Sequence, residues 1–286
     1  MADARVLLGR PVARNLNETT LERAREFAAK HKRHLALGVL ASADPAGKSY
    51  LKTIQSTAEA VGVTVHVVPV KADWKVTEVH SEIRRLNDDG TIDGILVQEP
   101  LPEGMSLEKV GRAVDPAKDL DGITPYQSGL LFRGARTALV PPTARAVLEI
   151  LDFYRYGLEG LEVVVLGRSL VVGKPMGVLA LSRNATVTWC HSRTKALPAI
   201  CKRAEILIVA IGKARFVDHR YVRPGATVID VGINVDEKGK LTGDVDAESI
   251  LSMATAYTPV PGGIGPVTTA CLFDNLLKAA RLRQTA

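Results

Sequence analysis

The first apolar pattern along the chain has the spacing of a helix. Within residues 18–33 the apolar side chains recur every three or four positions, so that they fall on one helical face: Leu21, Ala24, Phe27 and Ala28. Thr19 and Glu22 stand three residues apart near the start of this segment, and they predict a capping box.

Apolar runs and helical patterns then alternate regularly. The predicted strands are 35–41, 63–70 and 93–98, and the predicted helices between them are 49–61 and 76–88. Short apolar runs rich in Leu, Ile and Val that alternate with helices are typical of a parallel sheet covered on both faces. The first part of the chain is therefore predicted to be an α/β domain.

The pattern is interrupted by residues 115–126, which are rich in Asp, Pro and Gly and predict a loop. A helix at 143–157 and a second series of short strands follow, at 161–166, 185–190, 205–211 and 226–231. These elements predict a Rossmann-like, doubly wound second domain at 141–262. Residues 1–140 form the first domain, and the last helix, within 263–286, is predicted to pack back on it. We expect a cleft between the two domains, which is a usual place for a ligand.

Composition and charge exclude some classes of protein and ligand. Apolar residues make up 46% and charged residues 24% of the chain, as in ordinary globular proteins. No apolar run reaches the roughly 18 residues of a membrane span, and the N-terminus does not resemble a signal peptide, so we expect a cytoplasmic protein without a membrane partner. The net charge of +6 favours anionic ligands. Phosphate-bearing cofactors fit this charge better than nucleic acid, because the chain has no long Lys/Arg block and no RNA-binding aromatic motif.

Metal-ligating patterns are missing from the sequence. The three cysteines, Cys190, Cys201 and Cys271, are scattered and form no C-x-x-C pair. The six histidines show no H-x-H or H-x-x-x-H spacing. We therefore expect neither a disulfide scaffold nor a protein-bound metal.

The strand predicted to end at Leu166 leads into a glycine-containing turn, and a helix is expected to start near Lys174. Free backbone N–H groups and the helix dipole make such a turn an anion site. The predicted phosphate-binding residues are Gly167, Arg168, Ser169 and Gly173. The segment is not G-x-G-x-x-G, and an ordinary tight turn between strand and helix remains the alternative.

The end of the next strand indicates which dinucleotide is bound. An acidic residue usually stands there in NAD enzymes, but this chain has Ser192 and Arg193 instead, with Arg168 on the neighbouring turn. A hydroxyl and two guanidinium groups suit a 2′-phosphate, which favours NADP, although Arg193 can also be an ordinary surface charge. Small residues after the two following strands would let a nicotinamide ring approach the backbone near Gly212 and Ile233.

Four segments together carry a resemblance to a known family. They are Asp93–Pro102, Lys118–Tyr126, Gly167–Pro175 and Pro259–Thr268, the last of which contains the sequence PGGIGP. In this order they resemble the methylenetetrahydrofolate dehydrogenase/cyclohydrolase (FolD) family over essentially the whole chain.

The resemblance implies roles for individual residues. Asp121 is similar to the carboxylate that matches the amino and amide edge of the pterin, Gln98 to the residue that lines the reacting one-carbon unit, and Tyr50 to the tyrosine that stacks on the folate. The predicted substrate-binding residues are Tyr50, Gln98, Asp121, Pro261, Gly262, Gly263 and Pro266. Thr143 is similar to the threonine of a family turn and is added to the cofactor residues. Each also has a plain alternative, such as a turn-capping aspartate or a half-buried tyrosine.

The reaction that the resemblance implies is hydride transfer from 5,10-methylenetetrahydrofolate to NADP, which gives 5,10-methenyltetrahydrofolate. Most of the family then hydrolyses this product to 10-formyltetrahydrofolate. The resemblance also implies a homodimer formed through the cofactor domain.

One position departs from the family pattern. The family has a lysine four residues after the tyrosine, and this chain has Ile54 there; a second common family lysine falls at Ser56. Isoleucine can neither titrate nor donate a hydrogen bond, and Lys52 would lie on another face of the helix from Tyr50. We therefore expect a dehydrogenase with weak or no cyclohydrolase activity.

Three alternatives stay open at this stage. One is a bifunctional enzyme with a relocated base, and a second is a non-catalytic folate- or nucleotide-binding protein. The third is a dehydrogenase for a different pterin or for an amino acid.

Overall fold

The computed structural model describes residues 4–237 and 239–285. The chain forms two compact units. The six-stranded unit contains the described residues of Met1–Ala13 and Thr143–Thr268, and the three-stranded unit contains those of Arg14–Pro142 and Thr269–Ala286. Compared with the predicted domain bounds, the first 13 residues and 263–268 fall in the six-stranded unit, because the N-terminal strand pairs within its sheet.

The larger sheet consists of parallel strands in the order β1-β11-β8-β7-β5-β6. Its strands are β1 (Arg5–Val6), β5 (Glu162–Leu166), β6 (Thr186–Cys190), β7 (Ile206–Val209), β8 (Thr227–Asp230) and β11 (Ala256–Tyr257). The unit also holds a small hairpin, β9 (Asn234–Val235) and β10 (Leu241–Thr242), and the helices α6 (Pro142–Phe153), α7 (Gly173–Ser182), α8 (Leu197–Cys201) and α9 (Ala247–Ile250). The chain adds β6 on one side of β5 and β7 on the other, so the order reverses at β5, as in a doubly wound fold.

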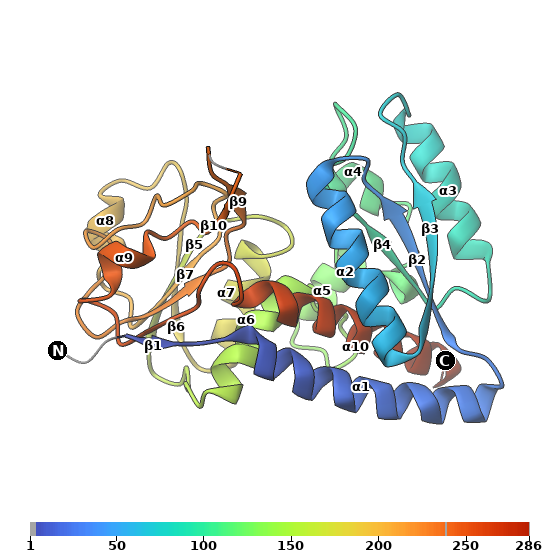
Figure 1. Ribbon diagram of the computed structural model, residues 1–286, viewed down its shortest axis with the longest axis horizontal. Coiled ribbons are helices and arrows are strands. Elements are labelled where there is room, and N and C mark those ends of the chain that lie inside the picture. Colours follow the sequence, from blue (N-terminus) through green and yellow to red (C-terminus); the bar gives the residue numbers. More distant parts are fainter. Residues whose placement is uncertain (1–3, 238, 286) are drawn as a thin grey trace. The chain divides into compact units, whose positions relative to one another are not determined.

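The smaller sheet has the order β3-β2-β4 and is also parallel. Its strands are β2 (Leu35–Ala41), β3 (Val63–Pro69) and β4 (Gly94–Val97). The helices of this unit are α2 (Pro45–Val61), α3 (Val76–Asp88), α4 (Leu107–Gly111), α5 (Pro125–Phe132) and a 3-10 turn, η1 (Pro116–Lys118). Every residue of the central strand β2 is buried, which explains its unbroken apolar sequence. Figure 1 shows the three strands between α2 and α3.

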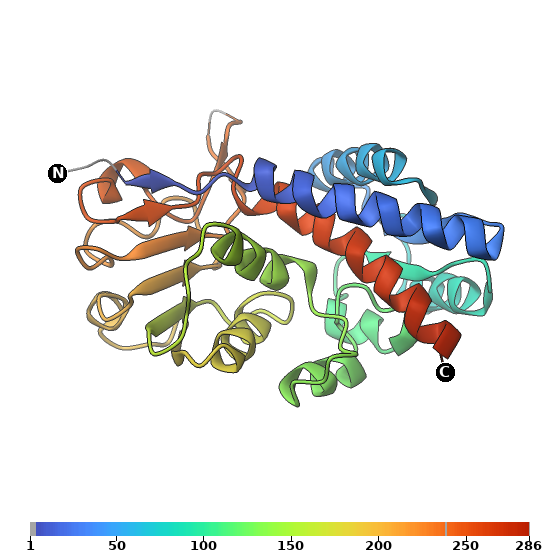
Figure 2. The same ribbon diagram turned by 90° about the horizontal axis from the view of Figure 1, so that it is seen from below.

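Two long helices, α1 (Gly9–His31) and α10 (Ile264–Thr285), continue into the three-stranded unit. Figure 2 shows them side by side, and ion pairs join Arg23 to Asp274 (3.7 Å) and Glu26 to Arg281 (3.5 Å). Their apolar faces share one core with α2 and β2, in which Phe273 is fully buried. The last helix therefore packs on the first α/β sheet.

The predicted capping box at Thr19 is wrong. The helix begins at Gly9, and the Thr19 hydroxyl donates to the carbonyl of Asn15 (3.1 Å), as happens inside a helix.

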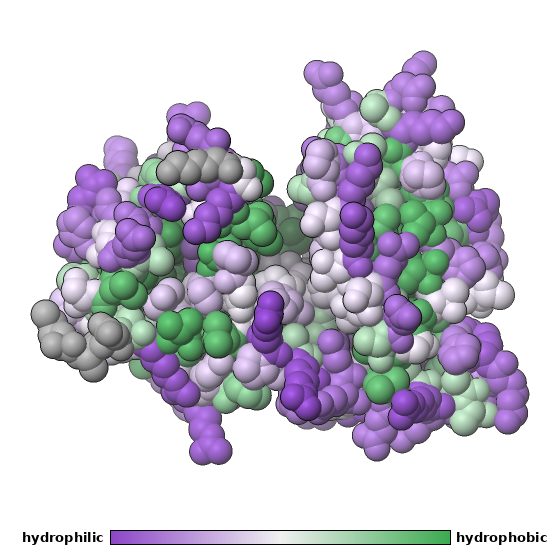
Figure 3. Space-filling model, in the orientation of Figure 1, coloured by the Kyte–Doolittle hydropathy of each residue, from purple (hydrophilic) through white to green (hydrophobic). Residues whose placement is uncertain are grey.

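Side-chain and glycine caps fix the two ends of α2 in the three-stranded unit. The Asp44 carboxylate accepts the N–H of Ala46 (2.8 Å) at the start of α2, and Gly62 ends that helix with φ +70°. The edge strand β3 leaves Val67 37% exposed. Figure 3 shows apolar patches among the polar surface of this face of the molecule. Within the described residues, no helix combines the length and the apolar character that a bilayer crossing requires.

Candidate functional site

In the six-stranded unit, the predicted cofactor residues follow neighbouring strands. Leu166, the last residue of β5, is paired with Cys190 of β6 and with Val209 of β7, and Val209 is paired with Asp230 of β8. The carboxyl ends of these four parallel strands therefore meet at one edge of the sheet, where the strand order reverses. This edge is where doubly wound sheets bind their ligands.

The turn after β5 has the geometry of an anion site. Gly167 has φ +140°, and a Cβ there would lie 2.2 Å from the carbonyl oxygen of Ala210, so only glycine fits. Gly173 starts α7, and a side chain there would collide with the backbone of Gly167. The Ser169 hydroxyl accepts the N–H groups of Val172 (3.2 Å) and Gly173 (3.3 Å), which fixes the entry to the helix. The turn therefore presents a helix N-terminus at a close-packed loop.

The turn after β6 exposes the two residues predicted to select the dinucleotide. The N–H of His191 donates to the Thr194 hydroxyl (2.9 Å), and the N–H of Arg193 donates to Nδ1 of His191 (3.1 Å). This tight turn leaves the side chains of Ser192 and Arg193 exposed, and Arg168 is exposed on the neighbouring turn. The arrangement suits a phosphate that is approached from solvent.

Sequence reasoning missed Trp189 of β6, which bonds to the start of α7. Its indole Nε1–H donates to the carbonyl of Gly173 (2.9 Å), and its ring lies over α7, where a Cβ on Gly177 would come within 2.1 Å of it. Gly177 could have indicated this contact, since a glycine inside a predicted helix often marks a close approach of another group.

The loops after β7 and β8 carry the remaining predicted cofactor residues. Gly212 has φ +65° and is exposed, and the side chain of Ile233 is 66% exposed. Both loops are held by buried carboxylates, Asp230 and Asp244, that sequence reasoning also missed. Their partners lie 2 to 33 residues away, so that no single spacing along the chain reveals them.

The PGGIGP segment lies in the same unit and starts α10. The peptide bond before Pro261 is cis, and Gly262 has φ +105° and accepts the N–H of Gly9 (2.8 Å). A Cβ on Gly9 would lie 1.8 Å from the carbonyl oxygen of Gly263, so two glycines meet here. Pro266 stands in the first turn of α10, and Thr143 is the second residue of α6.

In the three-stranded unit, Tyr50 and Ile54 lie one turn apart on α2. Ile54 is fully buried in the core of this unit, and Tyr50 packs against the same core. Lys52 is exposed, as its position on another face of the helix predicts. No amine therefore occupies the buried position after Tyr50.

Gln98 follows β4 and is 3% exposed. Its side-chain oxygen accepts the N–H of Ser42 (3.2 Å), and the Ser42 hydroxyl donates to the carbonyl of Pro100 (2.7 Å). Among the residues that the structure describes, Nε2 of Gln98 has no hydrogen-bond partner. A buried donor without a partner is costly, and it marks a place where a ligand or water is expected to bind.

The loop that carries Asp121 is fixed by its neighbours. The buried Lys118 ammonium donates to the carbonyls of Leu86 (2.9 Å), Asn87 (2.6 Å) and Asp89 (2.8 Å), which caps the end of α3. The Asp119 carboxylate accepts the N–H groups of Ile123 (3.1 Å) and Thr124 (2.7 Å). These bonds hold the backbone on both sides of Asp121.

Asp121 itself has an unusual protonation. Burial, with smaller contributions from the charges of Asp119 and Glu99, raises the pKa of Asp121 to about 8. Burial and the charge of Asp121 likewise raise the pKa of Tyr50, so these two side chains are electrostatic neighbours. Among the described residues, no group of three or more His, Cys, Asp or Glu side chains is arranged to hold a metal ion.

These features define a two-unit α/β protein, in which one unit has a dinucleotide-type strand edge and the other holds buried polar groups. Family models match both parts of the chain. Residues 7–121 match "Tetrahydrofolate dehydrogenase/cyclohydrolase, catalytic domain", and residues 141–284 match "Tetrahydrofolate dehydrogenase/cyclohydrolase, NAD(P)-binding domain". The chain belongs to the tetrahydrofolate dehydrogenase/cyclohydrolase family.

Similar proteins agree with this assignment. The chain is 47% identical over 245 residues to the bifunctional protein FolD of Methanoculleus marisnigri, with 86% of each chain covered. It is 45% identical to the bifunctional protein FolD of Acidiphilium cryptum over 98% of this chain and 99% of the other. A solved structure of the Trypanosoma brucei methylenetetrahydrofolate dehydrogenase-cyclohydrolase, complexed with NADP and an inhibitor, covers 100% of both chains with a TM-score of 0.93 and 32% identity. The predicted α/β fold and the predicted family are confirmed.

Proposed function

We propose that this protein oxidises 5,10-methylenetetrahydrofolate to 5,10-methenyltetrahydrofolate with NADP. The observation that carries the proposal is the buried Nε2 of Gln98, which has no hydrogen-bond partner among the described residues, in a chain of this family. The half-buried Asp121 is an electrostatic neighbour of Tyr50. In this reaction the cofactor accepts the hydride, and the protein has to hold the reacting carbon and the nicotinamide in place.

On the folate side, three residues of the three-stranded unit take the roles that the family resemblance implies. Asp121 accepts the N–H groups at the amino and amide edge of the pterin, which needs its ionised form. Gln98 offers Nε2 as a donor beside the one-carbon unit, and Tyr50 stacks on the folate. The family resemblance adds Pro261, Gly262, Gly263 and Pro266 to the proposed substrate-binding set.

On the cofactor side, the start of α7 and its preceding turn bind the pyrophosphate through Gly167, Arg168, Ser169 and Gly173. Ser192 and Arg193, with Arg168, bind the 2′-phosphate, and this selects NADP over NAD. Gly212 and Ile233 line the nicotinamide, and Thr143 completes the set. The exposed guanidinium groups and the absence of an acidic residue after β6 support this choice of cofactor.

The second family activity, hydrolysis of methenyltetrahydrofolate, is weak or absent in this proposal. Water activation needs a group that accepts and returns a proton, and the position that would hold the amine is a fully buried isoleucine, Ile54. One observation favours the alternative of a relocated base. Asp121, whose pKa is raised to about 8, can take up or release a proton near neutral pH.

Product analysis after a single incubation tests the proposal. Purified protein is mixed with 5,10-methylenetetrahydrofolate and NADP, and the folate species are identified over time against a sample without protein. Accumulation of methenyltetrahydrofolate and NADPH is expected. Formation of 10-formyltetrahydrofolate faster than in the blank would show a bifunctional enzyme, and no NADPH at all would contradict the dehydrogenase assignment.

The assembly proposed for the protein is a homodimer formed through the six-stranded unit, in the cytoplasm. Support for this interface comes from β6, an edge strand whose Trp189 is 42% exposed, and from Leu181 on α7, which is 60% exposed. Light scattering after size-exclusion chromatography measures the mass, and a monomer at micromolar concentration would contradict the dimer.

A further inference from the structure

Asp244 follows the hairpin strand β10, and its side chain is completely buried. Both carboxylate oxygens are occupied. Oδ2 accepts the backbone N–H groups of Ile211 (2.6 Å) and Gly212 (3.0 Å), and Oδ1 accepts that of Lys213 (2.7 Å). Oδ1 also accepts the side-chain amide of Asn234 (2.9 Å). One carboxylate thus collects four donors from two loops.

The three donors from residues 211–213 are consecutive. Successive N–H groups that point at one spot form a nest that ordinarily binds an external anion. Here the protein supplies the anion, so the loop after β7 is closed around Asp244. The conformation of Gly212, with its φ of +65°, is fixed by this contact.

The loop after β8 meets the same carboxylate. Besides the bond from Asn234, Gly232 lies so close that a Cβ there would be 2.2 Å from Cγ of Asp244. Ile233, the residue between them, is consequently held at a defined place while its side chain stays exposed.

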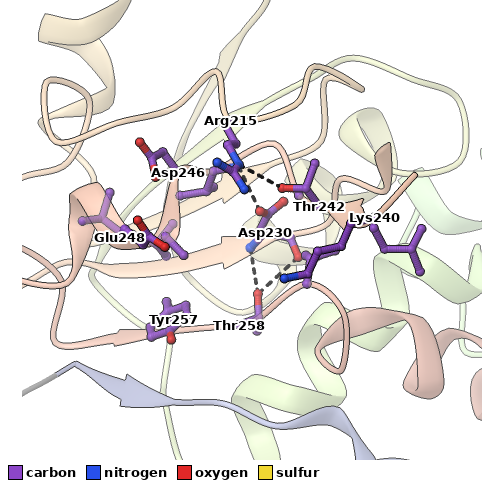
Figure 4. A pocket seen from close by; sticks show the side chains of 15 residues that line it. Arg215, Asp230, Lys240, Thr242, Asp246, Glu248, Tyr257 and Thr258 are labelled. Atoms are coloured by element: carbon purple, nitrogen blue, oxygen red, sulfur yellow. Dashed lines mark hydrogen bonds between the residues drawn. The ribbon is translucent and has the colours of Figure 1, made fainter. Parts of the chain in front are cut away.

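A second buried carboxylate anchors Asp244 in turn. The Asp230 carboxylate, at the end of β8, accepts the N–H groups of Asp244 (3.0 Å), Val245 (2.9 Å) and Gly232 (2.9 Å). Its backbone is bonded to Thr258, as Figure 4 shows. The two aspartates therefore link β8 to the loops after both β7 and β8.

We propose that Asp244 is a positioning residue for hydride transfer, which holds the Gly212 and Ile233 loops where they receive the nicotinamide. The inference rests on the proposed function, because it takes these two loops as the nicotinamide site. Asp244 would act only through the partners that it holds, since its own oxygens are fully used.

Three variants separate this role from simple support of the fold. Asp244→Asn keeps the shape of the side chain but only one of its two oxygens, so at least one loop loses its acceptor and faces an NH₂ group. Asn234→Ala removes only the side-chain bond to the Ile233 loop. Asp246→Asn is the matched control, because Asp246 lies two residues further along and is partly exposed, and its N–H instead bonds to Val217 (2.8 Å).

Each variant is examined in four ways. Calorimetry gives the Kd for NADP, and steady-state kinetics gives kcat and the KM for the folate. The primary isotope effect on kcat is measured with methylenetetrahydrofolate deuterated at the transferred position, and a thermal melt reports folding.

For Asp244→Asn we expect the Kd for NADP to rise about tenfold and kcat to fall roughly 10- to 100-fold, since displacement of a reacting group by about 1 Å costs up to about 100-fold. The KM for the folate should stay within about twofold, and the isotope effect should increase, because the hydride step becomes more limiting. Asn234→Ala should lower kcat about two- to fivefold with a smaller increase in the isotope effect, and Asp246→Asn should match the unaltered protein.

A role limited to folding would lower the melting temperature and the active fraction but leave the Kd and the isotope effect unchanged, and that result would overturn the proposal. If Asp244→Asn does not fold, Asn234→Ala decides the question by the same readouts. If the unaltered protein binds NADP but oxidises no folate, the proposed reaction fails, while the Kd values of Asp244→Asn and Asp246→Asn still decide whether Asp244 positions the cofactor loops.

Discussion

Asp121 in the three-stranded unit and the pair Asp230 and Asp244 in the six-stranded unit have opposite surroundings. In the six-stranded unit, Asp230 and Asp244 are surrounded by backbone N–H donors that occupy their oxygens. In the three-stranded unit, the half-buried Asp121 accepts no hydrogen bond from any residue that the structure describes, and the buried Nε2 of Gln98 has no partner either. A buried polar group with a full set of partners supports the fold, whereas one left without partners is placed for a ligand.

The comparison also explains where each unit meets its ligand. The six-stranded unit uses its buried carboxylates to shape loops and leaves recognition to backbone groups and exposed arginines. The three-stranded unit has its proposed recognition groups at buried or half-buried positions. Substitutions in the three-stranded unit should therefore have larger effects on activity than substitutions in the six-stranded unit.

The largest expected effect comes from giving the three-stranded unit the amine that it lacks. Ile54→Lys should raise hydrolysis of methenyltetrahydrofolate by roughly 10²- to 10⁴-fold, the usual contribution of a positioned acid–base group. The rate of hydrolysis is measured from the decrease in methenyltetrahydrofolate absorbance. Ile54→Met is the size-matched control without an amine, and Lys52→Ala should change nothing because Lys52 is exposed. A folded Ile54→Lys protein without any gain would mean that the amine does not reach the reacting carbon.

Removing the unpartnered carboxyl should have the next largest effect. Asp121→Asn is expected to lower kcat/KM for methylenetetrahydrofolate roughly 100-fold, because charge-assisted hydrogen bonds to the pterin are lost, while the Kd for NADP stays unchanged. Steady-state kinetics with Glu103→Gln as an exposed acidic control measures this. Equal losses for folate and NADP would remove the distinction between the two units.

The same variant should be more stable than the unaltered protein. The folded-state pKa of Asp121 is about 8, above the value of about 3.9 in unfolded chains. The ionised carboxyl therefore destabilises the fold, and this cost grows as the pH rises from about 4 and is complete above about 8. Asp121→Asn should melt higher than the unaltered protein at pH 8, by roughly 2–4 °C per kcal/mol relieved, and at the same temperature at pH 4.

A smaller effect is expected from pH alone. Below its pKa of about 8, Asp121 is protonated and offers fewer acceptor sites to the pterin. Desolvation maintains this raised pKa, with smaller contributions from the charges of Asp119 and Glu99. The Kd for tetrahydrofolate should therefore fall about tenfold per unit between pH 6 and 7.5 and level off above pH 8. Calorimetry across this range measures the slope, which Asp121→Asn should lack; a flat profile for the unaltered protein would mean that Asp121 is ionised throughout.

The smallest effect is expected at the exposed cofactor residues. Arg193→Ser should raise the KM for NADP about tenfold and leave that for NAD unchanged, since one exposed charge-assisted bond to the 2′-phosphate is lost. Lys195→Ser, two residues further on and also exposed, is the control. Equal changes for both dinucleotides would show that Arg193 does not contact the 2′-phosphate.

Much of the fold could be predicted because its strands are buried and continuous in sequence. The predicted strand at 35–41 coincides with β2, and the predicted 161–166 differs from β5 by one residue. The start of α1 could not be found this way, because its first turn contains Gly9 and Pro11, which ordinarily mark turns, and the Thr19 pattern occurs inside the helix.

The residues of the candidate site likewise differ in whether the sequence alone could indicate them. Residues in contiguous motifs, such as Gly167 and Asp121, could be predicted as candidates from the sequence. Asp230, Asp244 and Trp189 were missed, because each has partners that are distant in sequence. The absence of partners at Gln98 Nε2 is likewise a property of three-dimensional packing.

The hydrogen bond from Trp189 to the start of α7 also gives the protein an optical reporter. The chain has two tryptophans, Trp74 in the three-stranded unit and Trp189 in the six-stranded unit, so each unit carries one fluorophore. Trp189 touches the turn where the pyrophosphate is proposed to bind, and its emission should change when that turn is occupied. In a Trp74→Phe protein all indole emission would come from the six-stranded unit, and the unfolding of the two units could be followed one at a time.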